Sequence, residues 1–386
     1  MLARRASSDT HHIRVLAVTQ TPADQADPGT TVLKGADPAR VGRWLAERLG
    51  QPAWRDCSIT GIGHGRSNLT FRVTSSAGAV VLRRPPVGSV AATAHDMGRE
   101  QRVLSALAGT AVPVPSVLAS SAGAGSDSEP VDAPCYVMEL VDGIVPFGTP
   151  PERWAAEADR WRAGEALIDV LVALHQVDPA RVGLADFGRP DGFMARQVRR
   201  WSTQWDTWRE GSGADSATAS ELTALAEELA DGLPTAQRNT IVHGDYRIDN
   251  LMYDRDDPGR VRAVLDWEMS TLGDPLADLG LLMVYWNGAD DPPVWRRAQL
   301  LPSPSQAPGF PSRRQLAERY AERTGICLDP LPWYTAFGAF KLAVVLAGVL
   351  ARARAGAVPA DVANGISDAV APLVAVGRQV LREGLA

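Results

Sequence analysis

Lysine is nearly absent from this chain of 386 residues. Its 39 basic residues include only two lysines, Lys34 and Lys341, so the rest of the positive charge comes from arginine. We interpret this imbalance as a bias of composition. The chain also lacks a long basic run and has a net charge of −6. Nucleic-acid binding therefore has no electrostatic support from the sequence, because such binding depends on neutralising phosphates.

Cysteine is also scarce. Cys57, Cys135 and Cys327 lie far apart and no Cys-x-x-Cys pair is present. This spacing argues against a disulfide framework and against a structural zinc site, and it fits a protein of the reducing cytoplasm.

Long apolar runs are missing as well. The first twenty residues contain no continuous apolar stretch, so we expect no signal peptide. The run Leu342–Leu350 has nine residues, too few to cross a bilayer, so we expect no membrane partner.

The chain is long for a single core, and its pattern changes along its length. Residues 1–36 are polar and aperiodic, which predicts a flexible tail. Residues 37–141 are rich in strand patterns, and residues 142–386 are mostly helical, with short strands expected near 240–243, 250–253 and 261–266. The sequence therefore predicts an α+β protein with two lobes.

Local signals mark several elements of the first lobe. Asp37-Pro38 is typical of a helix start, and Gly50 of its end. Alternating apolar residues from Leu69 to Val73, then the turn at 75–78 and an apolar run at 79–82, predict a hairpin. Periodic apolar residues predict a helix over 95–108, and 135–141 is predicted to be a strand.

Hydrogen-bonding side chains are concentrated in the stretch V-H-G-D-Y-R-I-D-N-L at 242–251. A loop with Asp245 and, five residues later, Asn250 can do two tasks of phosphoryl transfer. The aspartate accepts or orients the proton of an attacking hydroxyl, and the amide oxygen helps to hold a metal ion. The alternative is structural: His243 and Asp245 cap a turn, and Asn250 satisfies loop backbone groups.

A second carboxylate follows the apolar strand V-R-A-V-L at 261–265. A hairpin between Asn250 and Asp266 would bring these two side chains close together. Amide and carboxylate oxygens suit Mg²⁺, which keeps water and phosphate oxygens as its other ligands. The alternative is that Asp266 caps the next turn.

A glycine-rich tip and a strand with arginines lie in the first lobe. The tip, G-I-G-H-G-R-S-N at 61–68, allows close approach of backbone N–H groups to phosphates, but it is followed by a strand and matches neither a Walker A nor a dinucleotide motif. No lysine lies near the strand V-V-L-R-R, so Arg83 or Arg84 is the only local cation for phosphate, one facing inward and one outward. Glu100 is a possible ion-pair partner, and an ordinary surface arginine pair is the alternative.

These stretches in this order resemble the aminoglycoside phosphotransferase family, and most closely its branch related to the kinase-like domains fused to some acyl-CoA dehydrogenases. The motifs are G-x-G-H-G-R-S-N-L-T, V-L-R-R-P-P, Y-V-M-E, V-H-G-D-Y-R-I-D-N and V-L-D-W-E-x-S-x-x-G-D-P-x-x-D-L, over residues 37–386. The resemblance implies a bilobal, protein-kinase-like fold, with a small antiparallel sheet in the N-lobe and a larger helical C-lobe. It also implies an enzyme that uses ATP and Mg²⁺ to phosphorylate a hydroxyl of a small molecule.

The resemblance assigns roles residue by residue. Asp245 becomes the catalytic base, Arg247 supports the loop or touches the transferring phosphate, and Asn250 and Asp266 hold magnesium. In the N-lobe Arg83 replaces the family's strand lysine and pairs with Glu100. The remaining nucleotide contacts are assigned to the phosphate loop and the hinge strand: Gly63, Gly65, Ser67, Asn68, Met138, Glu139 and Val141.

The acceptor site is less defined. Trp201, Trp205 and Trp208 repeat at helical spacing, and Tyr285 and Trp286 follow the Asp-Leu of the last motif. Such aromatic residues either belong to the core or form a wall of the acceptor pocket, for which Glu268, Trp201, Trp205, Tyr285 and Trp286 are the candidates. Asp274 and Asp278 fit a structural role. The arginine-rich helix around Trp201 favours an apolar or anionic acceptor, and the resemblance suggests a hydroxyacyl or CoA-like one.

Two rival functions remain open at the level of the sequence. The replacement of lysine by Arg83 is not neutral, since guanidinium is wider and planar, and it leaves room for a nucleotide-binding pseudokinase that regulates a partner. A true aminoglycoside resistance kinase is the second rival.

Overall fold

The computed structural model describes residues 35–62, 68–87, 97–121, 130–299, 302–358, 363 and 366–385. The chain divides into two compact units. Unit 1 comprises Met1–Ala108 and Pro115–Val141, and unit 2 comprises Gly109–Val114 and Asp142–Ala386. The second stretch of unit 2 begins at Asp142, where the sequence places the start of the helical lobe. The assignment of Gly109–Val114 to unit 2 was not predicted.

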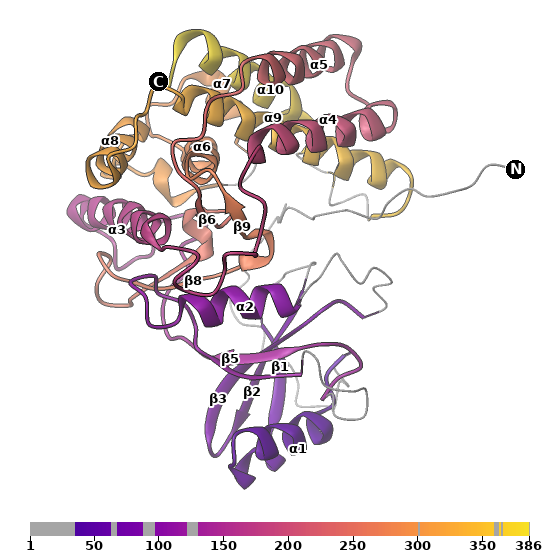
Figure 1. Ribbon diagram of the computed structural model, residues 1–386, viewed down its shortest axis with the longest axis vertical. Helices are drawn as coiled ribbons and strands as arrows, with labels where there is room; N and C mark the ends of the chain where they lie inside the picture. The colour runs from indigo at the N-terminus through magenta and orange to yellow at the C-terminus, as the bar shows by residue number, and fades with distance from the viewer. Residues whose placement is uncertain are drawn as a thin grey trace, which may run out of the picture. The chain divides into compact units, whose positions relative to one another are not determined.

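Unit 1 contains a five-stranded antiparallel sheet in the order β1-β2-β3-β5-β4. Its strands are β1 (Ser58–Gly61), β2 (Leu69–Ser75), β3 (Gly78–Arg84), β4 (Val117–Ser120) and β5 (Tyr136–Glu139). The predicted hairpin is confirmed, with Ser75 opposite Gly78 at its closed end. The two lobes of the expected α+β fold are thus represented by a sheet in one unit and helices in the other (Figure 1).

One face of this sheet is covered by α1 (Pro38–Arg48) and the short helix η1 (Pro52–Asp56). The predicted start of α1 is confirmed, because the Asp37 side chain accepts a hydrogen bond from the Arg40 N–H at 2.9 Å and Pro38 occupies the first turn. Val41 and Leu45 pack against Phe71 and other buried strand residues. Unit 1 also contains α2 (Met97–Leu107).

The predicted tail, residues 1–36, is shorter than expected at its C-terminal end. Ala36 is buried, and the Gly35 carbonyl accepts a hydrogen bond from Arg84 at 2.6 Å. Residues 1–34 lie outside the described residues, so the prediction for them stays a prediction.

Unit 2 is mostly helical. Its α-helices are α3 (Glu157–Gln176), α4 (Phe193–Ser212), α5 (Ser216–Asp231), α6 (Leu276–Tyr285), α7 (Pro293–Arg297), α8 (Arg313–Thr324), α9 (Leu331–Arg354) and α10 (Ser367–Glu383). Two short antiparallel pairs complete the unit: β6 (Thr240–Val242) with β9 (Thr271–Gly273), and β7 (Leu251–Tyr253) with β8 (Val261–Val264). The three predicted strands are β6, β7 and β8, and β9 was not predicted.

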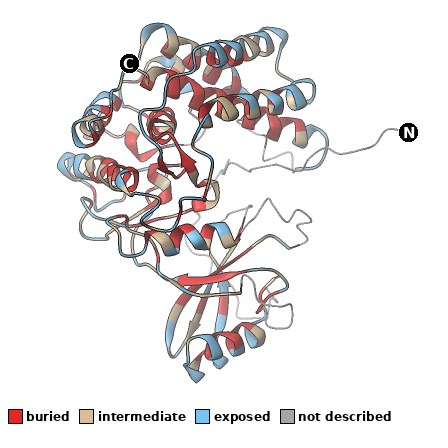
Figure 2. Ribbon diagram, in the orientation of Figure 1, coloured by how far each residue is buried: buried red, intermediate tan, exposed pale blue. Residues whose placement is uncertain are grey.

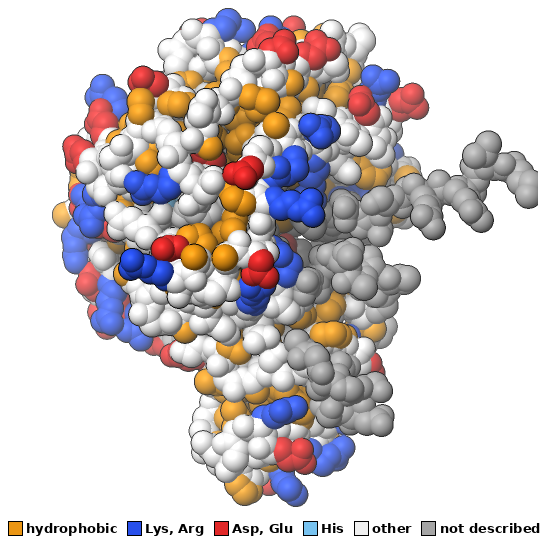
Figure 3. Space-filling view, in the orientation of Figure 1, with side chains coloured by type: hydrophobic (Ala, Val, Ile, Leu, Met, Phe, Trp, Pro, Cys, Tyr) orange, Lys and Arg blue, Asp and Glu red, His pale blue; other side chains and the backbone are white. Residues whose placement is uncertain are grey.

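Helix α9 forms the centre of unit 2 and packs against α4, α6 and α10. It extends well beyond the apolar run seen in the sequence and is long and apolar enough, by length and composition, to cross a membrane. Its apolar window is entirely buried in the structure, and the helix is drawn mainly as buried in Figure 2. A core helix of a helical domain has the same properties. On the face drawn in Figure 3, basic and acidic side chains are interspersed over the described residues.

Candidate active site

The candidate catalytic loop begins where β6 ends, at Val242. Gly244 adopts φ +84°, a left-handed conformation that favours glycine. A Cβ atom at this position would lie 2.7 Å from the Met269 carbonyl oxygen. Glycine is therefore required here both by its backbone angle and by the close approach of Met269, and it turns the chain so that Asp245 follows.

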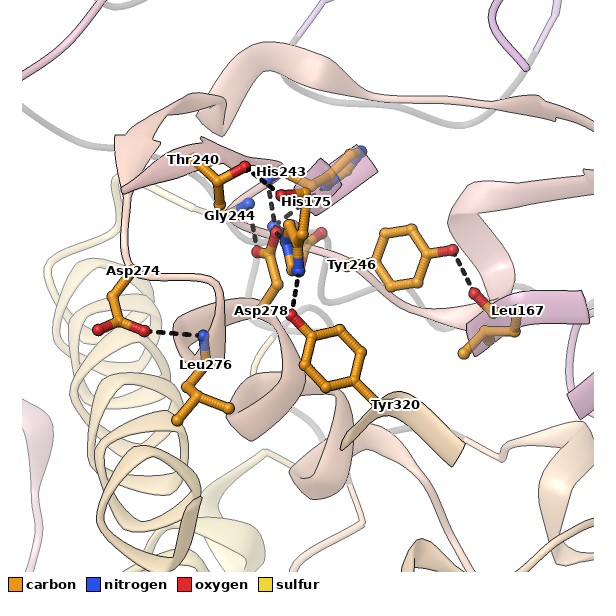
Figure 4. Close-up of polar contacts among 11 residues, drawn as sticks. Leu167, His175, Thr240, His243, Gly244, Tyr246, Asp274, Leu276, Asp278 and Tyr320 are labelled. Carbon is orange, nitrogen blue, oxygen red and sulfur yellow. Dashed lines mark hydrogen bonds and ion pairs between the residues drawn. The ribbon is translucent and has the colours of Figure 1, made fainter. Parts of the chain in front are cut away.

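Asp278, in the first turn of α6, anchors this loop from below (Figure 4). Its carboxylate accepts hydrogen bonds from the His243 N–H at 2.6 Å and the Gly244 N–H at 2.7 Å. His175 Nε2 lies 3.2 Å from the same carboxylate, and His175 Nδ1 lies 2.8 Å from the Tyr320 hydroxyl. The structural role predicted for Asp278 is confirmed.

Burial acts to raise the pKa of Asp278, but the hydrogen bond and electrostatic attraction from His175, with the hydrogen bond from the His243 N–H, outweigh it. The net result is a pKa below the ordinary aspartate value. Asp274 is also structural, since its carboxylate accepts from the Leu276 N–H at 2.9 Å and from the Tyr334 hydroxyl at 2.7 Å.

His243 braces the loop, a structural role close to the turn cap considered for it in the sequence. Its Nε2 donates to the Leu265 carbonyl at 2.9 Å, and its Nδ1 accepts from the Asp245 N–H at 3.3 Å. The ring is buried and lies against Trp267 and Tyr246. Both ring nitrogens are thereby engaged in holding the backbone of the loop.

Asn250 is oriented by Asp245. Its Nδ2 donates to the Asp245 carbonyl oxygen at 2.8 Å and to the Asp245 carboxylate at 3.1 Å. With the amide nitrogen held in this way, the buried Oδ1 has no hydrogen-bond partner within the described part of the chain. A buried acceptor left without a partner is costly, and it is a suitable ligand for a hard cation.

Asp266 lies beside Asn250 through the pairing of β7 with β8. Leu251 is opposite Val264, and the Leu265 N–H donates to the Asn250 carbonyl at 2.8 Å. Asp266 is buried and has φ 69°, the only positive φ among the described residues other than glycine. Such backbone conformations are concentrated at functional sites. The structure holds no cluster of three or more acidic, histidine or cysteine ligands among its described residues, so a metal here would need oxygen ligands from a bound phosphate, as Mg²⁺ commonly does.

Arg247 is buried against the carboxylates of the same loop. Its Nη1 lies 3.1 Å from Asp249 and its Nε 3.4 Å from Asp245, and its guanidinium is 5.0 Å from the Tyr285 ring centre. Burial acts to lower the pKa of Arg247, but the carboxylates of Asp249 and Asp245 outweigh it and the pKa lies above its usual range. The side chain is thus a permanent cation beside Asp245.

Lys341 reaches the loop from α9, and the sequence analysis missed it. Its ammonium donates to the Gly244 carbonyl at 3.0 Å and lies 5.7 Å from the centre of the Trp201 ring. Lys341 lies in an apolar stretch of the sequence, and this was a usable signal, since a lysine is seldom buried in an apolar helix without a polar partner.

The aromatic candidates for the acceptor pocket take different positions. Trp205 is fully buried and donates to Thr223 on α5 at 3.0 Å, and Trp286 is fully buried and donates to the Pro311 carbonyl at 2.9 Å. The structure favours the core alternative for these two. Trp201 and Tyr285 instead contact the cations Lys341 and Arg247, respectively, and Glu268 lies on the short helix η4 (Trp267–Met269) that follows Asp266.

In unit 1, Arg83 is the arginine that pairs with Glu100. Its Nη1 lies 3.0 Å from the Glu100 carboxylate, and both side chains are buried. Arg84 is buried too, but it donates to the carbonyls of Pro85 and Gly35. The two arginines therefore separate as strand alternation requires, since Leu82 faces the α1 side of the sheet and Arg83 the opposite side.

The other predicted nucleotide contacts are described in part. Asn68 is buried directly before β2, whereas Gly63, Gly65 and Ser67 lie outside the described residues. Met138 and Glu139 end β5, and the Glu139 N–H donates to the Ser116 carbonyl at 2.9 Å. Val141 is the last residue of unit 1. The roles assigned to these residues stay predictions.

Comparison with known proteins gives consistent matches. The family model "Phosphotransferase enzyme family" matches residues 58–316. The chain is 32% identical to mouse acyl-CoA dehydrogenase family member 10 over 315 residues, which is 81% of this chain and 28% of that protein. It thus spans a minor part of the length of this relative, and 41% of the rat family member 11.

Solved structures match over most of the chain. A putative aminoglycoside phosphotransferase from Ralstonia eutropha superposes with a TM-score of 0.74 at 30% identity, covering 90% of this chain and 98% of that one. A ternary complex of the aminoglycoside phosphotransferase APH(4)-Ia with ADP and hygromycin B superposes with a TM-score of 0.54 at 17% identity, covering 87% and 98%. The second likeness bears on the fold alone.

Proposed function

Because the chain belongs to the phosphotransferase enzyme family, we propose that it transfers the γ-phosphate of ATP, in the presence of Mg²⁺, to a hydroxyl group of a small molecule. The observation that carries this proposal is the arrangement of Asp245 and Asn250. The Asn250 side chain donates from Nδ2 to the Asp245 carboxylate, and the buried Oδ1 of Asn250 has no hydrogen-bond partner within the described residues.

Asp245 is the proposed base. Its backbone is held by His243, and its carboxylate is held by Asn250 and faced by Arg247. A carboxylate fixed in this way accepts or orients the proton of an attacking hydroxyl without a search over rotamers. Asn250 and Asp266 would hold Mg²⁺, which when bound supplies positive charge to the β- and γ-phosphates.

The cations have separate proposed tasks. Arg247, fixed by Asp249 and Asp245, would stabilise the charge of the phosphoryl group during transfer. Arg83, oriented by Glu100, would bind nucleotide phosphates in the place of a lysine, because a guanidinium can hold two phosphate oxygens at once. Nucleotide binding is further supported by the ADP present in the APH(4)-Ia complex.

Two arguments support a proposal for the class of acceptor: the lack of free acidic charge at Asp274 and Asp278, and the similarity to acyl-CoA dehydrogenase family members. Asp274 and Asp278 are fully used by hydrogen bonds within the fold, so neither supplies free charge for a polycationic drug. The relationship to acyl-CoA dehydrogenase family members supports a hydroxyacyl or CoA-like metabolite as the acceptor.

The variant Asp245→Ala tests the proposal. We expect it to retain binding of ATP and Mg²⁺, measured by calorimetry, and to lose ADP release with a panel of hydroxyl compounds. Asp256→Ala, a change at an exposed residue, serves as the control. Full turnover by Asp245→Ala would refute the assignment of the base.

Two rivals have their own readouts. Stabilisation by ATP with Mg²⁺ but no phosphate transfer to any hydroxyl compound would indicate a pseudokinase. Protection of a susceptible bacterial host against kanamycin-type drugs would indicate a resistance kinase.

A further inference from the structure

Two cations in unit 2 share one aromatic ring. The Arg200 guanidinium lies 5.6 Å from the centre of the Trp201 ring, and the Lys341 ammonium lies 5.7 Å from it. They come from different helices, α4 and α9. The positive charge of Arg200 disfavours the charged form of Lys341, and an anion bound beside Lys341 would offset this repulsion.

Lys341 has little to offset its charge. Its ammonium carries three N–H groups, and within the described residues it makes one hydrogen bond, to the neutral Gly244 carbonyl, and no ion pair. Burial lowers the pKa of Lys341, and the charges of Asp245 and Asp278 act in the opposite direction. A buried cation without a bonded counter-ion is unfavourable, and a bound anion would offset that cost.

Trp201 contributes an unused donor. Its buried Nε1–H has no acceptor among the described residues. The next two tryptophans of α4 differ, since Trp205 donates to Thr223 and Trp208 donates to Gln204 at 3.1 Å. Among these three tryptophans of α4, Trp201 is therefore the one that contacts the cations. It is also the one whose indole N–H has no acceptor among the described residues.

The position of this cluster relates it to the reaction. Lys341 is bonded to Gly244, the residue that directly precedes Asp245. Arg247 differs from Lys341, because the carboxylates of Asp245 and Asp249 already lie 3.4 and 3.1 Å from its guanidinium.

We propose that Lys341, Arg200 and Trp201 form a subsite that binds an anionic group of the acceptor, a carboxylate or a phosphate, while the acceptor's hydroxyl meets Asp245. The proposal rests on the proposed phosphotransferase function and narrows its substrate to hydroxy compounds that carry negative charge. Polycationic aminoglycosides are disfavoured by the same charges.

Matched acceptor pairs test the subsite. Hydroxycarboxylates with two to six carbons would be compared with their neutral amides, and glycerol 3-phosphate with glycerol, by ADP release. We expect kcat/KM to favour the anionic member by roughly 10- to 100-fold, the size of a charge-assisted hydrogen bond. The two series also distinguish a carboxylate from a phosphate as the natural group.

The variants Lys341→Met and Arg200→Met should bring this preference close to one, with the KM for ATP unchanged. Arg200→Met should act mainly through a higher KM for the acceptor, whereas Lys341→Met also removes the hydrogen bond to the Gly244 carbonyl and should lower kcat as well. Met preserves the length of the Lys341 side chain and removes a buried charge; Arg200 is partly exposed, so its variant should fold in any case. The controls are Arg199→Met on α4 and Arg352→Met on α9, which should keep the wild-type preference. An unchanged preference in both test variants, or a matching rise in the KM for ATP, would overturn the subsite.

A binding measurement separates this proposal from the phosphotransferase function. Tryptophan fluorescence of the full chain would be titrated with inorganic sulfate at constant ionic strength and without nucleotide. A saturable change in the wild type and in Arg199→Met, absent from Lys341→Met, supports the subsite even if no acceptor is phosphorylated. The lack of any saturable change, or an equal change in Lys341→Met, counts against it.

Discussion

The peptide group between Gly244 and Asp245 is held from several directions. Its carbonyl accepts from Lys341, its N–H donates to His243, and the preceding N–H of Gly244 donates to Asp278. Side chains from α9, from α6 and from the loop itself thus define one backbone conformation. A side chain attached to such a peptide starts from a fixed direction, which is what a base needs to meet a hydroxyl.

Replacing Gly244 by alanine should therefore affect both stability and catalysis. The positive φ costs about 1 kcal/mol for alanine, and the approach of the Met269 carbonyl to 2.7 Å adds a clash, for a total of about 3 kcal/mol. Urea unfolding measures the loss. The control is Gly148→Ala, where φ is +69° and no atom lies within 4 Å of the new Cβ. Gly148→Ala should lose only the free energy that the positive φ costs an alanine. An equal loss of unfolding free energy in the two variants would contradict the role of Met269.

Asp278 predicts a pH effect on stability. Its pKa is below the usual value in the folded protein, so its stabilising effect is present above the unfolded pKa of about 3.9 and is lost as the pH falls through the folded pKa. Asp278→Asn should lower the free energy of unfolding by about 3 kcal/mol at neutral pH.

The difference between Asp278→Asn and the wild type should then shrink as the pH falls below about 4. Urea unfolding at several pH values measures this, with Asp256→Asn as an exposed control. A difference that stays constant across the acid range would show that the charge of Asp278 is not what stabilises the loop.

At the scale of residues, spacing along the sequence was informative where the chemistry is local. Asp245 and Asn250 lie on one loop, and the turn between β7 and β8 brings Asp266 to them, so a hairpin argument could place all three. Lys341 is nearly a hundred residues away from Gly244 in sequence. No local pattern in the sequence indicates which turn of a buried helix contacts which loop. The contact between Lys341 and Gly244 could therefore be found only from the tertiary packing of α9.

Among the helices, the crossing of α6 and α9 is the contact that positions the loop. Helix α6 carries Asp278 and α9 carries Lys341. The two can approach closely because Gly280 faces Tyr334, whose backbone carbon would lie 2.5 Å from a Cβ on Gly280. A rigid backbone atom cannot move aside as a side chain can.

Gly280→Ala should accordingly push the two helices apart. We expect a loss of about 2–4 kcal/mol in unfolding free energy and a fall in kcat of any detected reaction, because both loop anchors shift. Gly377→Ala on α10 is the matched control, since the nearest atom to its new Cβ is the end of the Leu225 side chain, at 2.8 Å, and the nearest backbone atom is 3.4 Å away. If the control proved as damaging as Gly280→Ala, helix spacing would not be the cause.

Elements with their own local signals were predicted well. Helix α1 has an N-cap and a first-turn proline, and the β2–β3 hairpin has an alternating first strand, a turn and an apolar second strand. Strands β4 and β9 were not predicted because each is very short and exists through its partner: β9 pairs with β6, and β4 pairs with β5 across an irregular register. Such strands are defined by tertiary pairing, which a local pattern does not contain.

For the molecule as a whole, linkage between ligand and folding offers a test of the metal site. If Asn250 and Asp266 hold Mg²⁺ with a nucleotide, ATP should raise the melting temperature strongly with Mg²⁺ and weakly with EDTA. At about 100 times its dissociation constant the ligand would add about 2.7 kcal/mol.

Asn250→Ala should abolish most of the Mg²⁺-dependent rise in melting temperature that ATP causes. Without ligand, the melting temperature of the variant should stay within a few degrees of the wild type. The measurement is differential scanning fluorimetry, and Asn287→Ala offers an asparagine control elsewhere in unit 2. A full Mg²⁺-dependent shift in Asn250→Ala would exclude Asn250 as a ligand.

The segment Gly109–Val114 has a consequence for how the chain is made. It belongs to unit 2, and the Pro113 carbonyl accepts from the Val264 N–H at 2.8 Å, yet it is followed by the last two strands of unit 1. During synthesis, this segment leaves the ribosome long before β8 exists to meet it. A fragment begun at Asp142 would lack this contact altogether, so a single cut at this boundary deprives unit 2 of one of its own backbone pairings.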